Sequence, residues 1–165
     1  RRTVWLGANL LTAILAAAAI GIFEATIEKV VALAILMPIV ASMGGIAGMQ
    51  SLALVIRSQA TNQIGESNSR LLIIKESLIG VLNGILWSSI VAVAVYLWFD
   101  SVFLGTVIAS ALMINLIIGA ISGVSLPLIL KKMDIDPALA GGVILTTITD
   151  IVGFISLLGV ATIIM

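Results

Sequence analysis

The sequence predicts an all-α integral membrane protein, a bundle of five transmembrane helices that occupies residues 1–165 as a single domain. Hydrophobic residues make up 61% of the chain and charged residues 10%, whereas soluble domains carry about 25% charged residues. Five apolar runs are long enough to cross a hydrocarbon core, which needs about 20 helical residues. These runs lack the strict apolar–polar alternation over roughly ten residues that membrane β-strands require. The fold class is therefore a helical bundle.

Charged and polar residues between the apolar runs mark approximate limits for the five spans. We expect spans at residues 4–22, 30–56, 71–99, 102–130 and 138–164. They are separated by "FEATIEK", by the polar loop "RSQATNQIGESNSR", by Asp100 alone and by "KKMDIDP". Spans two to five are longer than a bilayer needs, so they should tilt, kink or protrude.

The positive charges are distributed unevenly about these spans. If the N-terminus is cytoplasmic, the basic residues on that side are Arg1, Arg2, Arg57, Arg70, Lys75, Lys131 and Lys132. The opposite side then carries only Lys29. Cytoplasmic loops are enriched in Lys and Arg. We therefore expect a multi-pass protein of the cell inner membrane, with the N-terminus cytoplasmic and the C-terminus outside.

The residue inventory excludes several function classes. Histidine and cysteine are absent from the sequence, and zinc and copper sites depend mainly on imidazole and thiolate ligands. Any metal handled by this chain should therefore be a hard cation with oxygen ligands. No nucleophile-elbow motif and no phosphate-binding loop occurs, so enzyme activity is not expected. The basic residues form no patch suited to nucleic acid.

Asp150, near the middle of the fifth span, is the strongest candidate for a functional residue. A carboxylate at the centre of a bilayer costs roughly 2.5–3.5 kcal/mol on insertion scales, and such acids tend to mark ion or proton pathways. On a helix, Thr146, Gly142 and Gly153 would share its face. This small, polar face is typical of a water-filled path. It is also compatible with close helix packing, in which Asp150 would bond to a neighbouring helix.

Three further acids lie near the ends of the predicted spans. Asp136 precedes Pro137, which is typical of a helix N-cap followed by proline at the first helical position. Asp136 could equally be an acid at the cytoplasmic mouth of a path to Asp150. On the outer side, Glu24 and Glu28 belong either to a solvated loop or to a vestibule that attracts cations.

The second span has an irregular composition. Pro38 removes a backbone hydrogen bond in mid-helix. The segment "GGIAG", with Gly45 at its second position, has a conformationally flexible backbone because glycine has no side chain. Gln50 follows two residues after this segment. Broken helices often build transport sites, which makes Gly45 and Gln50 pore candidates. A simple kink with close helix packing explains the same residues.

Polar residues in the third and fourth spans have structural interpretations. Asn115 lies on a ridge of small residues and is expected to make helix contacts. Glu76, just inside the third span, is expected to pair with Lys75 or a loop cation at the membrane interface.

Taken in order along the chain, these landmarks resemble the membrane domain of the MgtE family of magnesium channels and transporters. The matching segments are "FEATIEKVVALAILMPIVASMGGIAGMQS", Arg57, "KES" at Lys75, "LPLILKKMDIDPA" and "TTITDIVG". The resemblance covers nearly the whole chain, and its specificity comes from the order and spacing of the segments.

The resemblance implies a homodimer with the pore between protomers, embedded in the lipid bilayer. It also implies a cytoplasmic regulatory portion that would precede the membrane domain and is absent from this chain. By position, Asp150 would face a largely hydrated magnesium ion, and Thr146 and Gly142 would offer backbone carbonyls below it. Asp136 would lie near the cytoplasmic end of the pore, and Glu24 on the outer side.

The sequence departs from the family pattern at positions that are usually polar. Ile46 and Met49 stand where the family commonly has asparagine, and Gly141, Gly142 and Val143 replace a Ser-Asn pair followed by proline. Side-chain oxygens that could contact a hydrated ion are therefore missing, which leaves the choice among Mg²⁺, Mn²⁺ and other hard divalent cations open.

Three functions follow from these observations. The first is a divalent-cation channel or transporter, with magnesium as the transported ion and Asp150 as the central acid. The second is a secondary transporter coupled to protons or sodium through the same aspartate. The third is a scaffold that transports nothing.

Overall fold

The structure, a computed structural model, describes residues 2–61 and 66–165, and this part of the chain folds into helices. They are α1 (Arg2–Gly21), α2 (Glu24–Lys29), α3 (Ala32–Ala60), α4 (Glu66–Phe99), α5 (Val102–Lys132) and α6 (Pro137–Ile164). Five of these helices are long and apolar enough to cross a membrane. The all-helical fold class with five spans is therefore confirmed.

Two connections differ from their predicted form. Helices α3 and α4 extend into the predicted polar loop, as far as Ala60 and from Glu66. The centre of that loop, residues 62–65, lies outside the described residues, as does Arg1. The segment "FEATIEK", predicted as a loop, contains the short helix α2. Glu24 in its first turn and Lys29 in its last complement the helix dipole.

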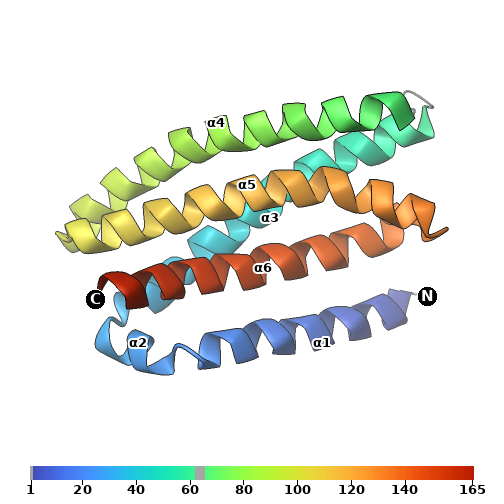
Figure 1. Ribbon diagram of the computed structural model, residues 1–165. Helices are drawn as coiled ribbons and strands as arrows, with labels where there is room; N and C mark the ends of the chain where they lie inside the picture. The colour runs from blue at the N-terminus through green and yellow to red at the C-terminus, as the bar shows by residue number, and fades with distance from the viewer. Residues whose placement is uncertain (1, 62–65) are drawn as a thin grey trace.

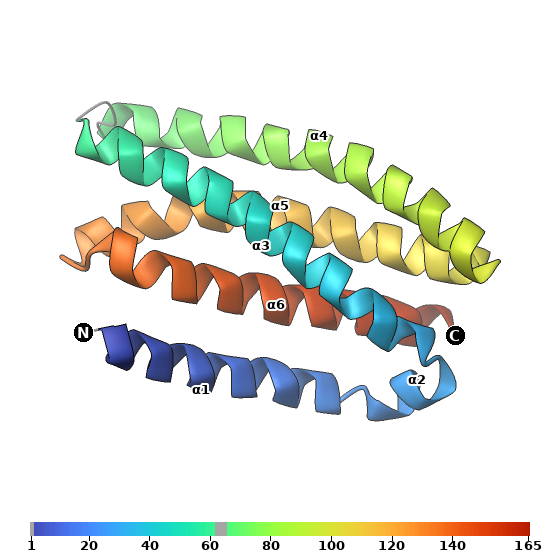
Figure 2. The same cartoon turned by 180° about the vertical axis from the view of Figure 1, so that it is seen from behind.

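The helices form a flat bundle in which α6 lies between α5 and α1, while α4 covers the opposite edge (Figure 1). Helix α3 crosses the bundle at an angle on one face, which the view from behind brings to the front (Figure 2). It packs against both α5 and α6, and α4 packs against α5. The two chain termini lie at opposite ends of the bundle, as an odd number of spans requires (Figure 1).

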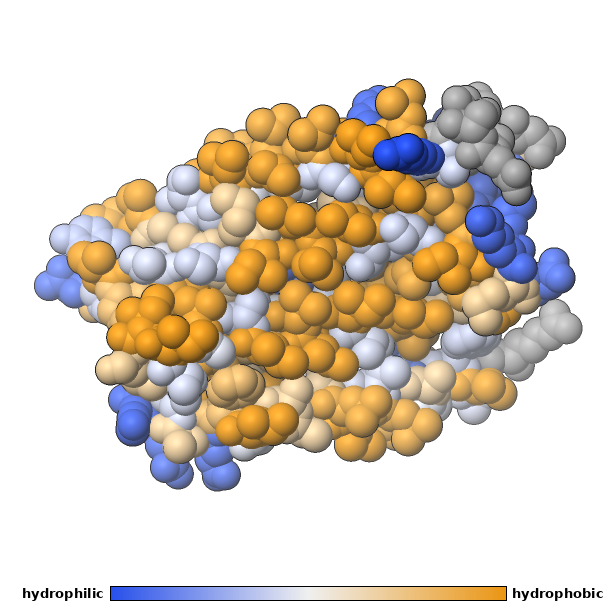
Figure 3. Space-filling model, viewed as in Figure 1, coloured by the Kyte–Doolittle hydropathy of each residue, from blue (hydrophilic) through white to orange (hydrophobic). Residues whose placement is uncertain are grey.

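The surface of the bundle has the pattern of a membrane protein. Hydrophobic residues cover its length, and hydrophilic residues gather mainly at the two ends (Figure 3). Helix α1 is the most exposed span, and α5, at the centre, is the most buried. Burial of α5 explains why it carries few charged residues before its last turn, where Lys131 and Lys132 lie.

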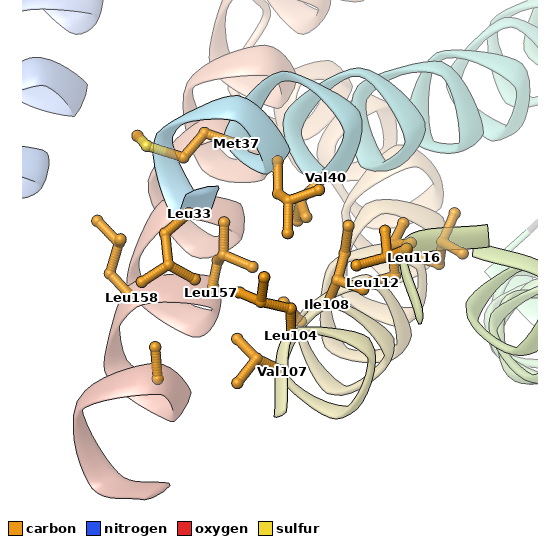
Figure 4. Packing of buried hydrophobic residues seen from close by; sticks show 14 residues of the cluster. Leu33, Met37, Val40, Leu104, Val107, Ile108, Leu112, Leu116, Leu157 and Leu158 are labelled. Carbon is orange, nitrogen blue, oxygen red and sulfur yellow. The ribbon is translucent and has the colours of Figure 1, made fainter. Parts of the chain in front are cut away.

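The main apolar core fills the half of the bundle that contains α2 and the C-terminus. It joins the first turns of α3 and α5 to the last turns of α6 (Figure 4). Its fully buried members include Leu33, Val40, Ile108, Leu112 and Leu157. The two cavities that have a carboxylate in their lining, at Asp150 and Glu76, lie further toward the other end.

Helix α3 is continuous through both Pro38 and the glycine-rich segment. A broken helix, one of the two interpretations of this segment, is therefore not what forms. The glycines instead allow α3 and α5 to touch backbone to backbone. A Cβ atom on Gly119 would lie 2.6 Å from the carbonyl oxygen of Gly44, and one on Gly48 would lie 2.9 Å from the carbonyl oxygen of Gly119.

Candidate functional site

Helix α6 places Asp150 deep along the bundle. The helix begins at Pro137, and the Asp136 side chain caps it by accepting a hydrogen bond from the Ala138 backbone N–H at 2.9 Å. At 1.5 Å per residue, Asp150 lies about 20 Å from this end. The 28-residue helix therefore carries its acid close to the midpoint of the span.

Asp150 and Thr146 line a groove of about 530 Å³ between α3 and α6. Gly45 and Gln50 contribute from α3, so the groove brings together four of the residues that the sequence singled out. The other lining residues are Ala41, Ser42, Ile46, Met49 and Ala53. The α3 positions recur every three or four residues, and the two α6 positions are one turn apart, so each helix contributes a single face.

Asp150 is the single charged residue that lines this groove. It is half-buried, and its carboxylate forms no hydrogen bond or ion pair with any residue in the described part of the chain. The described residues contain no cluster of three or more acidic side chains that could hold a metal. The chain therefore supplies a single carboxylate to the groove, which suits a hydrated cation better than a dehydrated one.

The backbone carbonyls that the family resemblance implied as ligands are already engaged by hydroxyl groups. The Thr146 hydroxyl donates to the carbonyl of Gly142 at 3.0 Å. The Thr149 hydroxyl donates to the carbonyl of Thr146 at 3.1 Å. The oxygens best placed to meet an ion in the groove are therefore side-chain atoms, those of Asp150, Thr146, Gln50 and Ser42.

The remaining predicted residues lie outside the groove. Gly142 lies at its edge, where an added Cβ would be 3.8 Å from the Met49 methyl carbon. Asp136 is exposed and serves as the cap of α6. Glu24 is exposed in α2, at the opposite end of the bundle from Asp136. These two acids could act only at the ends of a path, away from Asp150.

Gly153 and Asn115 lie where helices pack closely against one another, as the packing interpretation of their sequence positions predicts. Asn115 is fully buried, and its amide donates to the Val40 carbonyl at 2.8 Å. A Cβ on Gly153 would lie 2.8 Å from that amide nitrogen. Gly153 therefore allows α6 to pack against Asn115 and takes no part in the groove lining.

Glu76 differs from its expected role. It is only 8% exposed, and it accepts a hydrogen bond of 2.8 Å from the Ser51 hydroxyl, whereas Lys75 beside it is exposed. The interfacial ion pair with Lys75 was therefore a wrong expectation. A sequence signal for this burial exists, since Glu76 precedes Gly80 and Gly84 at four-residue spacing, and all three positions are buried.

Thr26 shows why the segment Glu24–Lys29 is not a solvated loop. Its side chain is 6% exposed, and its hydroxyl shares a hydrogen bond of 2.7 Å with that of Thr162 in α6. This bond fastens α2 to the last turn of α6.

The chain is similar to known proteins over nearly its whole length. A family described as "MgtE: Divalent cation transporter" matches residues 37–160. The magnesium transporter MgtE of Bacillus subtilis is 38% identical over 162 residues, which is 98% of this chain and 36% of that protein. The magnesium transporter MgtE of Thermus thermophilus is 31% identical over 160 residues, which is 97% of this chain and 35% of that protein.

A third relative extends the match to the full chain. The magnesium transporter MgtE of Enterococcus faecalis is 28% identical over 165 residues, which is 36% of that protein. The chain thus spans just over a third of the length of these relatives. The apolar helices and the length of the match agree with the resemblance seen in the sequence, and this membrane protein therefore belongs to the MgtE family, whose members are transporters and not enzymes.

Proposed function

We propose that this chain forms the membrane part of a channel or transporter for divalent cations, with Mg²⁺ as the ion and Asp150 as the central acid of its path. The observation that carries the proposal is the free carboxylate of Asp150 in the groove between α3 and α6, near the middle of the span. The magnesium transporters among its relatives support the choice of ion. Mn²⁺, another hard cation, is the natural competitor.

The groove is open on one protomer, and a second copy would close it. A twofold axis beside the groove would bring two Asp150 carboxylates to the same depth. Two negative charges would balance one divalent ion, and magnesium is often held by one or two carboxylates together with several waters. A shell of six waters occupies roughly 180 Å³ at about 30 Å³ each. The groove of about 530 Å³ has room for that shell.

The charge distribution supports an orientation for this path. Arg57, Lys131 and Lys132 belong to the helix ends that lie with the N-terminus, whereas Lys29 belongs to the other end. We infer that the N-terminal end faces the cytoplasm of a cell with this protein in its inner membrane. Asp136 would then lie at the cytoplasmic end of the path, and Glu24 at the outer end.

The test is ion flux into proteoliposomes that contain the purified protein, with Asp150→Asn as the variant. We expect Mg²⁺ uptake to fall at least about tenfold, equivalent to roughly 1.4 kcal/mol, because the amide removes the charge and keeps the shape. Ser156→Ala is the matched control, since Ser156 lies on α6, bonds to the Gly153 carbonyl and does not line the groove. Unchanged uptake by Asp150→Asn would overturn the proposal.

The same vesicles separate a channel from a coupled carrier. Uptake driven by the magnesium gradient alone should persist when pH and sodium concentration are equal on both sides. Uptake that requires a proton or sodium gradient would instead assign Asp150 to a coupled transporter. Crosslinking across the groove, from a cysteine introduced at Ala53, tests the homodimer, because this residue lines the groove in each copy.

A further inference from the structure

A second cavity with a polar lining lies beside the groove, enclosed by α3, α4 and α5. It measures about 230 Å³ and is more enclosed than the groove. Its polar lining comes from Gln50 and Ser51 of α3 and from Glu76 and Asn83 of α4. Apolar and small residues of α3, α4 and α5 form the rest of its wall. We call this cavity the Glu76 chamber.

Glu76 has no basic partner among the side chains that the structure describes. Its side chain is 8% exposed, and the Ser51 hydroxyl is the partner that the structure gives it. Among the side chains of residues 3–61 and 69–165, no Lys or Arg forms an ion pair with it. A buried carboxylate without a partner of opposite charge is strongly unfavourable, so buried charges are usually paired or coordinate a metal.

The oxygen atoms around Glu76 suit a hard cation. The Ser51 hydroxyl uses its proton in the bond to Glu76, which leaves its own lone pairs available. Gln50 and Asn83 add amide oxygens to the lining. Magnesium is often bound through one carboxylate while it keeps several waters. At about 30 Å³ per water, the chamber holds roughly seven waters, enough for a partly hydrated ion.

Gln50 connects the chamber to the groove. It lines both cavities, with Asp150 and Thr146 on one side and with Ser51 and Glu76 on the other. Gln50 is the lining residue that the two cavities share, and its amide is a polar group common to both.

We propose that the Glu76 chamber is a second cation site, one in each protomer, that binds a partly hydrated hard divalent cation with Glu76 as its charged ligand. The proposal rests on the proposed function, because the ion reaches the chamber through the groove. It places two carboxylates at different depths, one at Asp150 in the open path and one at Glu76 beside it.

Mn²⁺ binding to the purified protein, followed by electron paramagnetic resonance, tests this site directly. The variants are Asp150→Asn, Glu76→Gln and the two combined. Asp150→Asn should retain about one Mn²⁺ per chain, and the combined variant should lose it. Ser51→Ala in the Asp150→Asn background should weaken this binding about tenfold, the size of effect seen when a residue that orients a metal ligand is removed.

Control measurements distinguish a loss of cation binding at Glu76 from a loss of the folded structure. Glu76→Gln keeps the shape of the side chain and an oxygen for the Ser51 hydroxyl, and its melting temperature reports whether the bundle is intact. Asp100→Asn is the matched control for an acid-to-amide change, because Asp100 is an exposed turn residue with φ 49°, a conformation that asparagine tolerates. If Glu76→Gln fails to fold, Ser51→Ala alone decides.

Three results would overturn the chamber site. The first is Mn²⁺ binding in the Asp150→Asn background that neither Glu76→Gln nor Ser51→Ala changes. The second is an Asp150→Asn protein that binds no Mn²⁺. The third is displacement of the retained Mn²⁺ when sodium replaces choline at equal ionic strength, since a divalent site should discriminate against sodium. None of these results affects the flux test of Asp150, so each proposal can fail without the other.

Discussion

The groove and the Glu76 chamber each contain one carboxylate within the membrane spans, but they hold it in opposite ways. Asp150 is half-buried and makes no side-chain bond within the described part of the chain, and it faces a groove of about 530 Å³. Glu76 is 8% exposed, is fixed by Ser51 at 2.8 Å and faces a cavity of about 230 Å³. An unfixed acid in an open groove suits an ion that passes, whereas a fixed acid in an enclosed cavity suits an ion that stays.

Helix α3 couples these two regions because it forms a wall of both. Its Gln50 lines both cavities, and its next residue, Ser51, holds Glu76. The position of α3 is in turn set by its glycine contacts with α5. A change in those contacts should therefore disturb both regions together, whereas a change in either acid should affect one region.

The largest effect is expected from Gly123→Leu. A Cβ on Gly123 would lie 2.9 Å from the Ser51 Cβ and would also meet the Gly48 carbonyl. Overpacking of this kind costs about 1–3 kcal/mol and occasionally more, and here the obstacle is backbone. We expect a much lower yield of folded protein, measured by size-exclusion chromatography and thermal denaturation. A variant of normal stability would show that α3 and α5 can separate without loss of the fold.

Replacement of each acid by alanine tests the contrast between them directly. Glu76→Ala leaves the buried Ser51 hydroxyl without its acceptor, which should cost about 1–3 kcal/mol of stability. Asp150→Ala removes a side chain that makes no such bond, so its effect should stay within about 0.5 kcal/mol. Denaturation in detergent with a chelator present measures both. Equal losses would mean that Asp150 also has a structural role.

The sequence predicted the five spans, and the position of Asp150 near the middle of the last one, for physical reasons that are local. Length and hydropathy define a span, and an acid within an apolar run is conspicuous whatever its neighbours. The membership of the groove was partly predictable, because Thr146 lies one turn before Asp150 on the same face of the helix. Gly45 and Gln50 were singled out only as parts of an irregular segment.

The sequence could not predict contacts that depend on how helices pack. Lys75 beside Glu76 suggested an interfacial pair, but the helical phase of α4 turns Glu76 inward with Gly80 and leaves Lys75 exposed. The glycine-rich part of α3 suggested either a broken helix or close helix packing, because glycine is typical of both. Only the position of α5, whose backbone lies against these glycines, identifies close packing as their role.

A smaller effect is expected from Asp136→Ala at the N-terminal end of α6. Loss of the hydrogen bond to the Ala138 N–H should destabilise the protein by about 1 kcal/mol. Asp136→Asn should restore most of that stability, because asparagine is also a good cap. If Asp136 also acts at the mouth of the path, the asparagine variant will regain stability but take up Mg²⁺ more slowly. Equal recovery of stability and uptake would restrict Asp136 to the cap.

The smallest effect, and the one that bears on selectivity, is expected from Ile46→Asn in the groove. Ile46 is 56% exposed and lines the groove with Asp150, so an amide can replace it without opening a cavity in the core. One added hydrogen bond to a bound water contributes about 0.5–1.5 kcal/mol. Mg²⁺ affinity should therefore rise roughly two- to tenfold, measured by calorimetry, and Mn²⁺ affinity should rise less because manganese sheds its waters more readily. Ile163→Asn, the same substitution at a still more exposed position at the end of α6, is the control. If the amide at position 46 changes neither affinity, ions do not contact this wall of the groove, and Asp150 alone determines which cation binds.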